Sequence, residues 1–131
     1  MSTSPSESAQ RAPVVLIHGM WMTPLSWEHW VKRYSERGHQ VLAPAWPGLD
    51  AEPEKLRNDP SPLRGLGITD VVDHYDNIIR RLDRPPIIIG HSFGGLFTQL
   101  LLDRGLGAAG VALGTGVLAP ARLQRRLAPE T

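Results

Sequence analysis

The stretch Ile87-Ile88-Ile89-Gly90-His91-Ser92-Phe93-Gly94-Gly95-Leu96 decides the fold of this chain. Its run of isoleucines is typical of a strand that is buried on both faces, as in a parallel sheet. A glycine-flanked segment with Ser92 at its centre follows at once, and the residues after it favour a helix. The stretch therefore predicts a strand, a sharp turn and a helix in immediate succession.

The turn has the form G-x-S-x-G, which is the motif of a nucleophile elbow. In such an elbow the serine adopts a strained conformation that exposes its hydroxyl, and glycines at positions 90 and 94 keep side chains out of the tight crossing. The motif predicts that Ser92 is the nucleophile of a serine hydrolase. The alternative is a glycine-rich turn without chemistry. A phosphate-binding loop is rejected because the Lys-[Ser/Thr] of a P-loop and the G-x-G-x-x-G spacing are both missing.

Other apolar segments predict the rest of an α/β fold. Strands are expected at residues 14–17, 40–43, 87–90 and 111–113. Helices are expected from Trp27 with Ser26 as N-cap, from Ile68 to Leu82 with Thr69 as N-cap, and after the elbow as far as Gly105. This alternation of strands and helices predicts a parallel sheet with right-handed crossovers. Residues 44–67 contain five prolines and three glycines and are predicted to form a loop.

Length and composition narrow the class of protein. The 131 residues suit one compact domain, with a core at 13–117, a disordered tail at 1–12 and a basic tail at 118–131. A net charge of +1 does not favour binding to nucleic acid or to an anionic membrane. No apolar run approaches the length of a membrane span. The absence of cysteine and the scattered histidines predict no metal and no cofactor. The N-terminus lacks an apolar secretory segment, so we expect a cytoplasmic location.

Three motifs together resemble the α/β-hydrolase family. His18-Gly19 follows the first strand, residues 44–48 form a Pro-rich segment after the second, and the elbow lies at residues 90–95. These come in the order and spacing typical of that family, and the resemblance covers about residues 13–116. It implies that the four strands correspond to the third to sixth strands of the family's eight-stranded sheet, with the strand before the elbow lying beside residues 14–17.

The resemblance also implies the roles of individual site residues. Ser92 would be the nucleophile, and the backbone N–H groups of Met20 and Phe93 would form the oxyanion hole. Trp21 and His18 are assigned to substrate binding: Trp21 would line an apolar pocket with Phe93, and His18 would support the oxyanion loop. The implied substrate is a small apolar molecule with an ester or similar acyl bond.

The chain departs from the family pattern after the nucleophile. The family's triad continues with an Asp or Glu and then a His, but no histidine follows Ser92. Asp103 would lie about 16 Å further along the same helix, too far to orient a base at the elbow. We therefore expect the N-terminal half of a hydrolase, truncated after the fourth strand, with an exposed sheet edge that favours self-association. The alternatives are an inactive half-domain that binds a ligand or partner, and C–C or cyanohydrin lyase chemistry on the same scaffold.

Overall fold

The computed structural model describes residues 11–20, 22–48, 58 and 65–114. Its elements are, in chain order, β1 (Val14–Ile17), the 3-10 helix η1 (Pro24–Trp27), α2 (Glu28–Glu36), β2 (Val41–Leu42), α4 (Ile68–Arg80), β3 (Ile87–His91), α5 (Phe93–Asp103) and β4 (Ala109–Leu113). The predicted tails, at 1–12 and 118–131, lie almost wholly outside the described residues.

The strands form one parallel sheet in the order β2-β1-β3-β4. Val14 lies opposite Val41 on one side and Ile87 on the other, so β1 is central. The predicted neighbours, β1 and the elbow strand β3, are confirmed. Because all strands run in the same direction, their carboxyl ends meet at one edge of the sheet, where the loop after β1 and the elbow both emerge.

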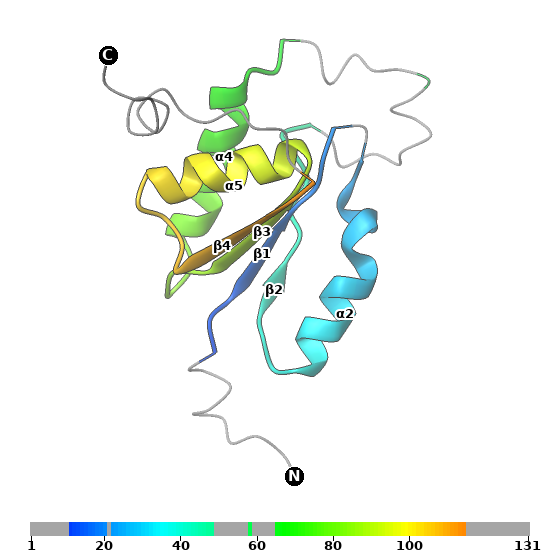
Figure 1. Ribbon diagram of the computed structural model, residues 1–131, viewed down its shortest axis with the longest axis vertical. Coiled ribbons are helices and arrows are strands. Elements are labelled where there is room, and N and C mark those ends of the chain that lie inside the picture. Colours follow the sequence, from blue (N-terminus) through cyan, green and yellow to red (C-terminus); the bar gives the residue numbers. More distant parts are fainter. Residues whose placement is uncertain (1–10, 21, 49–57, 59–64, 115–131) are drawn as a thin grey trace, which may run out of the picture.

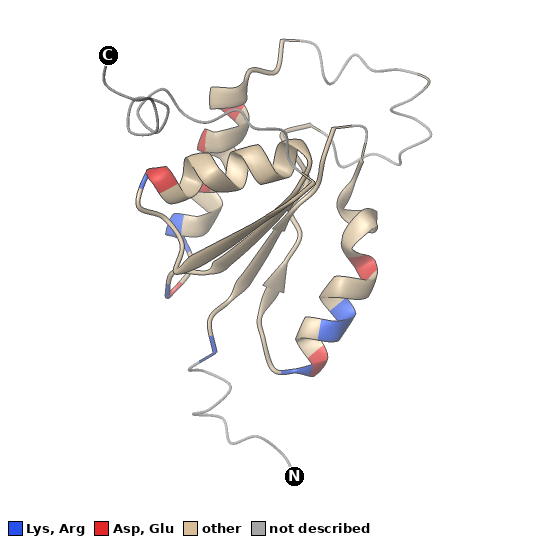
Figure 2. Cartoon of the chain, viewed as in Figure 1, with Lys and Arg blue, Asp and Glu red and all other residues tan. Residues whose placement is uncertain are grey.

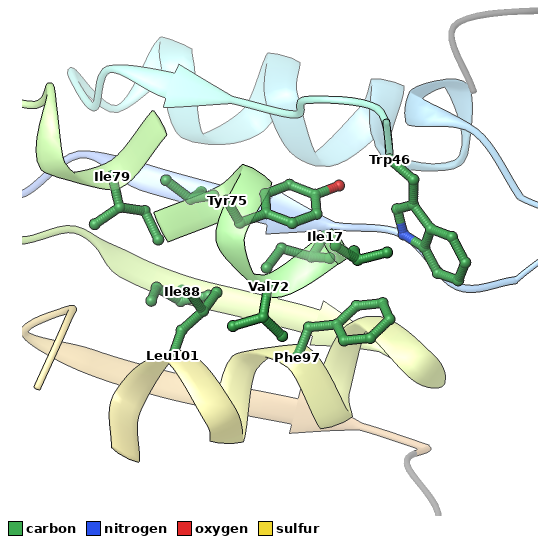
Figure 3. Packing of buried hydrophobic residues seen from close by; sticks show 10 residues of the cluster. Ile17, Trp46, Val72, Tyr75, Ile79, Ile88, Phe97 and Leu101 are labelled. Atoms are coloured by element: carbon green, nitrogen blue, oxygen red, sulfur yellow. The ribbon is translucent and has the colours of Figure 1, made fainter. Parts of the chain in front are cut away.

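Helices cover both faces of the sheet, with α4 and α5 on one side and α2 on the other (Figure 1). Alternate residues of each strand point to opposite faces. Val15, Ile17 and Ile88 join side chains of α4 and α5 in a cluster of ten buried residues, part of which Figure 3 shows. Val14 and Leu16 join Trp27 and Ile89 in a smaller cluster of four on the α2 side.

The starts of two helices differ from the sequence prediction. Thr23, not Ser26, caps the 3-10 helix: its Oγ1 accepts a hydrogen bond of 3.3 Å from the N–H of Leu25. At α4 the carboxylate of Asp70 accepts a 2.9 Å bond from the N–H of Gly67, while the expected cap, Thr69, lies inside the helix. The inserted 3-10 turn explains the first error, since it delays the start of α2 to Glu28.

The described Lys, Arg, Asp and Glu residues lie on the helices, in the turns or just before β1, and the strands carry none (Figure 2). Asp76 accepts hydrogen bonds from Arg80 in its own helix and from Arg104 at the end of α5, the latter at 2.9 Å. Burial opposes ionisation of Asp76, but its bonds to Arg104 and Arg80 outweigh burial and lower its pKa. The carboxylate thus joins α4 to α5.

No helix within the described ranges is long and apolar enough to cross a membrane.

Candidate active site

Ser92 occupies the sharp turn between β3 and α5, as the motif predicts. Its φ of 58° and ψ of −121° make it the sole non-glycine residue with positive φ in the described part of the chain. Backbone bonds hold the turn from both sides: the N–H of Ser92 donates to Leu113 O at 2.9 Å, and Ser92 O accepts from the N–H of Gly95 at 2.9 Å. The Ser92 side chain makes no capping bond to α5, so its hydroxyl is left for other chemistry.

Two glycines of the motif are required by close backbone contact. A Cβ at Gly90 would lie 2.0 Å from Gly94 O, and a Cβ at Gly94 would lie 2.1 Å from Ile17 O. Both separations are far below van der Waals contact with backbone atoms that cannot easily move. The absence of these side chains therefore lets the first turn of α5 lie directly against β3 and the end of β1.

The loop after β1 passes beside the nucleophile. A Cβ at Gly19 would meet Ser92 Cβ at 3.0 Å and Ser92 Oγ at 3.6 Å. The next residue is Met20, one of the two oxyanion-hole residues in the sequence prediction. The other, Phe93, is the first residue of α5, where an N–H has no acceptor within the helix and the helix dipole favours negative charge. That both N–H groups reach one oxyanion stays a prediction.

His18 is buried beneath this loop, with 1% of its surface exposed. The backbone N–H of Trp46 donates to His18 Nε2 at 3.3 Å, so the proton of the neutral ring is on Nδ1, which donates to Gly19 O at 2.9 Å. Burial lowers the pKa of His18, and its bond to Gly19 opposes this shift less strongly. His18 therefore supports the loop, and with both ring nitrogens in use it does not act as a base for Ser92.

Trp46 also contacts His18 through a second hydrogen bond and through stacking of the two rings. Its indole Nε1 donates to His18 O at 2.9 Å, and the two rings stack with centroids 5.4 Å apart and planes 14° apart. Trp46 lies in the Pro-rich segment at residues 44–48, and the sequence motifs indicate no role for it. Its position three residues after a predicted strand was the available signal.

Helix α4 holds the segment that carries Trp46. Tyr75 Oη donates to Pro44 O at 2.7 Å, and His74 Nε2 lies 3.0 Å from Ala45 O. Burial raises the pKa of Tyr75, so its hydroxyl keeps its proton and remains a donor. His74 is half-buried, and its ring contacts this segment. A chain of contacts thus runs from α4 through Trp46 and His18 to the loop beside Ser92.

An apolar cavity of about 90 Å³ opens next to the elbow. None of its lining side chains is charged; they are Met20, Trp46, Leu66, Gly67, Ile68, Val71, Phe93 and Phe97. Trp46, Val71 and Phe97 are at most 4% exposed and form its floor, whereas Met20 and Ile68 are 38% and 46% exposed and form its rim. We call this cavity the elbow pocket.

The elbow pocket contains two of the residues that the sequence analysis assigns to the site. Met20 and Phe93 line it, but Ser92 is not among its lining residues, and Trp21 lies outside the described residues. His18 lies behind Trp46 and does not line the pocket. The sequence did not predict that α4 lines the pocket. Its apolar face, which includes Val71, is explained equally well by packing in the hydrophobic core.

None of the histidines, all of which lie within the described ranges, is hydrogen-bonded to Ser92. His39 contacts Ala12 O at 2.8 Å, and His29 is exposed beside Glu28. His91 lines a separate cavity of about 210 Å³ with Trp27. In the same part of the chain, no three His, Asp or Glu side chains group as metal ligands would.

The sequence matches the alpha/beta hydrolase family over residues 14–130. The chain belongs to this family. Among curated proteins, no significant match is found.

Solved structures of this family share the fold. A pyrethroid hydrolase from Sphingobium faniae JZ-2 has a TM-score of 0.66 and 23% identity, covering 83% of this chain and 42% of its own. A monoacylglycerol lipase from Paleococcus ferrophilus has a TM-score of 0.63 and 24% identity, with 88% and 46% covered. A thioesterase domain from the curacin biosynthetic pathway has a TM-score of 0.64 and 19% identity, with 90% and 43% covered. The chain spans less than half the length of these proteins.

Proposed function

We propose that this chain carries the nucleophile and the oxyanion hole of a serine-dependent hydrolase that cleaves esters or similar acyl bonds. The observation that carries the proposal is the strained conformation of Ser92 at the start of α5, with the Gly19 loop against its side chain. The fold of the family and its esterase, lipase and thioesterase neighbours support the same class of reaction.

In the proposed reaction, Ser92 Oγ bonds to the acyl carbon and the Ser92 hydroxyl gives its proton to a general base. The backbone N–H groups of Met20 and Phe93 stabilise the oxyanion of the tetrahedral intermediate. The bond from the acyl carbon to the alcohol oxygen then breaks, and the base protonates the departing alcohol. Water hydrolyses the acyl-serine and regenerates the hydroxyl. The base and its acid partner are not among the described residues.

The test is acylation of Ser92 by p-nitrophenyl acetate, followed by mass spectrometry of the intact chain. Serine without a base is a weak nucleophile, so we expect slow acylation, little or no turnover, and a faster reaction when imidazole is added as an external base. Ser92→Ala should abolish the acyl adduct. Ser35→Ala, on the exposed surface of α2, is the matched control and should leave it unchanged. Failure to detect Ser92-dependent acylation with imidazole would contradict the proposal.

A second candidate function is ligand binding without catalysis. The observation that favours it is the state of His18, whose two ring nitrogens are both bonded within the protein. In that case the elbow pocket would bind an apolar ligand, and imidazole would not promote acylation of Ser92.

Two further expectations remain proposals. They are a cytoplasmic location and self-association through the exposed edge of β4.

A further inference from the structure

We propose that the elbow pocket selects short aliphatic acyl groups of about two to four carbons, and that Val71 in α4 sets this limit. The inference rests on the proposed function, since it assigns a substrate class to the same site. It concerns the size and shape of the group bound next to Ser92, which the reaction class leaves open.

The position of the pocket matches the acyl side of an ester. Met20 and Phe93 line its mouth, and their N–H groups are the proposed donors to the carbonyl oxygen. Phe93 directly follows Ser92, and Gly19, which precedes Met20, lies against the Ser92 side chain. A carbonyl group held by these donors therefore has the pocket as the nearest apolar space for its attached chain.

The chemistry of the pocket favours hydrocarbon. Its lining residues are aromatic, aliphatic or glycine, with no charged side chain among them. The indole N–H of Trp46, the polar group of its floor, is already bonded to His18 O. A carboxylate or ammonium group would enter without a partner, and such burial is strongly unfavourable. An alkyl group needs no partner and gains from leaving water.

The volume of the pocket limits the group to a few carbons. The elbow pocket measures about 90 Å³. An apolar cavity of about 150 Å³ takes up one benzene molecule, and a water molecule occupies about 30 Å³ of the liquid. The elbow pocket is smaller than this benzene-binding cavity, so a chain of about three carbon-sized units beyond the carbonyl fits it better than an aromatic ring. Longer chains would have to pass over the exposed rim at Ile68.

The floor resists expansion because its residues are held by other contacts. Trp46 is fixed by two hydrogen bonds to His18, and its ring meets that of Phe97 edge to face at 5.1 Å. Figure 3 shows Trp46 and Phe97 side by side at one end of the core. Phe97 in turn contacts Phe93, with ring centroids 6.3 Å apart. Val71 is the one aliphatic residue of this floor, so a change in its volume alters the space with least disturbance to the aromatic contacts.

The first experiment measures binding without chemistry. The Ser92→Ala chain is titrated with methyl acetate, methyl butyrate, methyl octanoate and methyl benzoate, and the indole N–H signal of Trp46 is followed by NMR. We expect affinity to rise from acetate to butyrate, and octanoate and benzoate to bind at least tenfold more weakly than butyrate. Octanoate or benzoate binding as tightly as butyrate, with the same Trp46 shift, would overturn the proposal.

Substitutions at Val71, with Val72 as the matched control, test the residue assignment. Both valines are 2% exposed on α4, but only Val71 is among the pocket-lining residues. Val71→Ala should move the tightest binding to a longer chain, and Val71→Ile should weaken butyrate binding at least tenfold. Val72→Ala and Val72→Ile should leave the order of affinities unchanged. If Val71→Ile does not fold, the affinities of Val71→Ala are compared with those of Val72→Ala. Equal effects on the preferred chain length at the two positions would contradict the role of Val71.

The pocket and the catalytic proposal can fail separately. The wild-type chain is acylated with p-nitrophenyl acetate, butyrate and octanoate in the presence of imidazole. Ser92-dependent acylation without preference for short chains would overturn the pocket while leaving the nucleophile in place. A short-chain preference in binding, with no acylation at Ser92, would support the pocket and contradict the hydrolase.

Discussion

The two faces of the sheet are packed to different degrees. On the side of α4 and α5, ten buried residues form one cluster, and backbones touch where Gly90 and Gly94 carry no side chain. On the side of α2, the buried cluster has four residues, and Met22, Leu25 and Trp30 are exposed. The candidate site is built on the densely packed face. The difference teaches that the positions of Ser92 and its neighbours depend on backbone contacts and buried hydrogen bonds, which loosely packed elements do not provide.

The largest effect is expected from adding one methyl group at the elbow. Gly90→Ala places a Cβ against the backbone of Gly94 and should cost more than about 4 kcal/mol of unfolding free energy, or prevent folding. Gly110→Ala is the control in the neighbouring strand, because its Cβ would meet the end of the Leu102 side chain, which can move. Overpacking of that kind costs about 1–3 kcal/mol. Urea denaturation measures both, and a tolerated Gly90→Ala would contradict the close crossing.

A second comparison uses one tryptophan from each face. Trp46→Phe removes the indole donor from His18 O and leaves space at the floor of the elbow pocket, so it should cost about 2–3 kcal/mol. Trp30→Phe, at a position that is 38% exposed, should change stability by less than about 0.5 kcal/mol. Thermal unfolding of the two variants gives the comparison. Equal losses would mean that the two faces are equally well packed.

The stability of the site face should depend on pH through His18. Because burial lowers the pKa of His18 below 6.5, the unfolded chain binds a proton at this residue before the folded chain does. This contribution to stability is therefore fully present above pH 6.5 and is lost as pH falls toward the lowered pKa. Chemical denaturation between pH 7.5 and 5 should show the loss. His18→Phe should flatten the profile, whereas His29→Gln, on the exposed surface of α2, should retain it.

The smallest effect concerns the strain at Ser92. Its positive φ is costly for a residue with a side chain and is freely adopted by glycine. Ser92→Gly should therefore be about 1 kcal/mol more stable than Ser92→Ala, although both remove the hydroxyl. Differential scanning calorimetry can resolve this difference. Identical stabilities would show that the turn is relaxed, which would weaken the case for an elbow built for exposure of the nucleophile.

Local patterns predicted the turn, and the family resemblance predicted the strand order and the loop beside Ser92, but neither predicted the floor of the pocket. Val71 was assigned to an apolar helix face, and its helix position alone does not show which part of that face reaches Phe93. Trp27 and Trp30 follow the same helical spacing, yet one is 4% and the other 38% exposed. Periodicity gives the direction of a side chain around its helix, and the neighbours that cover it come from elsewhere in the chain.

The sequence by itself determined the parallel sheet and the sharp turn that holds Ser92, because buried β-branched runs and the steric demands of Gly90 and Gly94 act over a few neighbouring residues. Only the tertiary structure decided that Trp46 locks His18 in a neutral, buried state, and that α4 closes the elbow pocket. The bonds between Trp46 and His18 join residues 28 positions apart. They depend on which segments the completed core brings together, and that is a property of the whole packing arrangement.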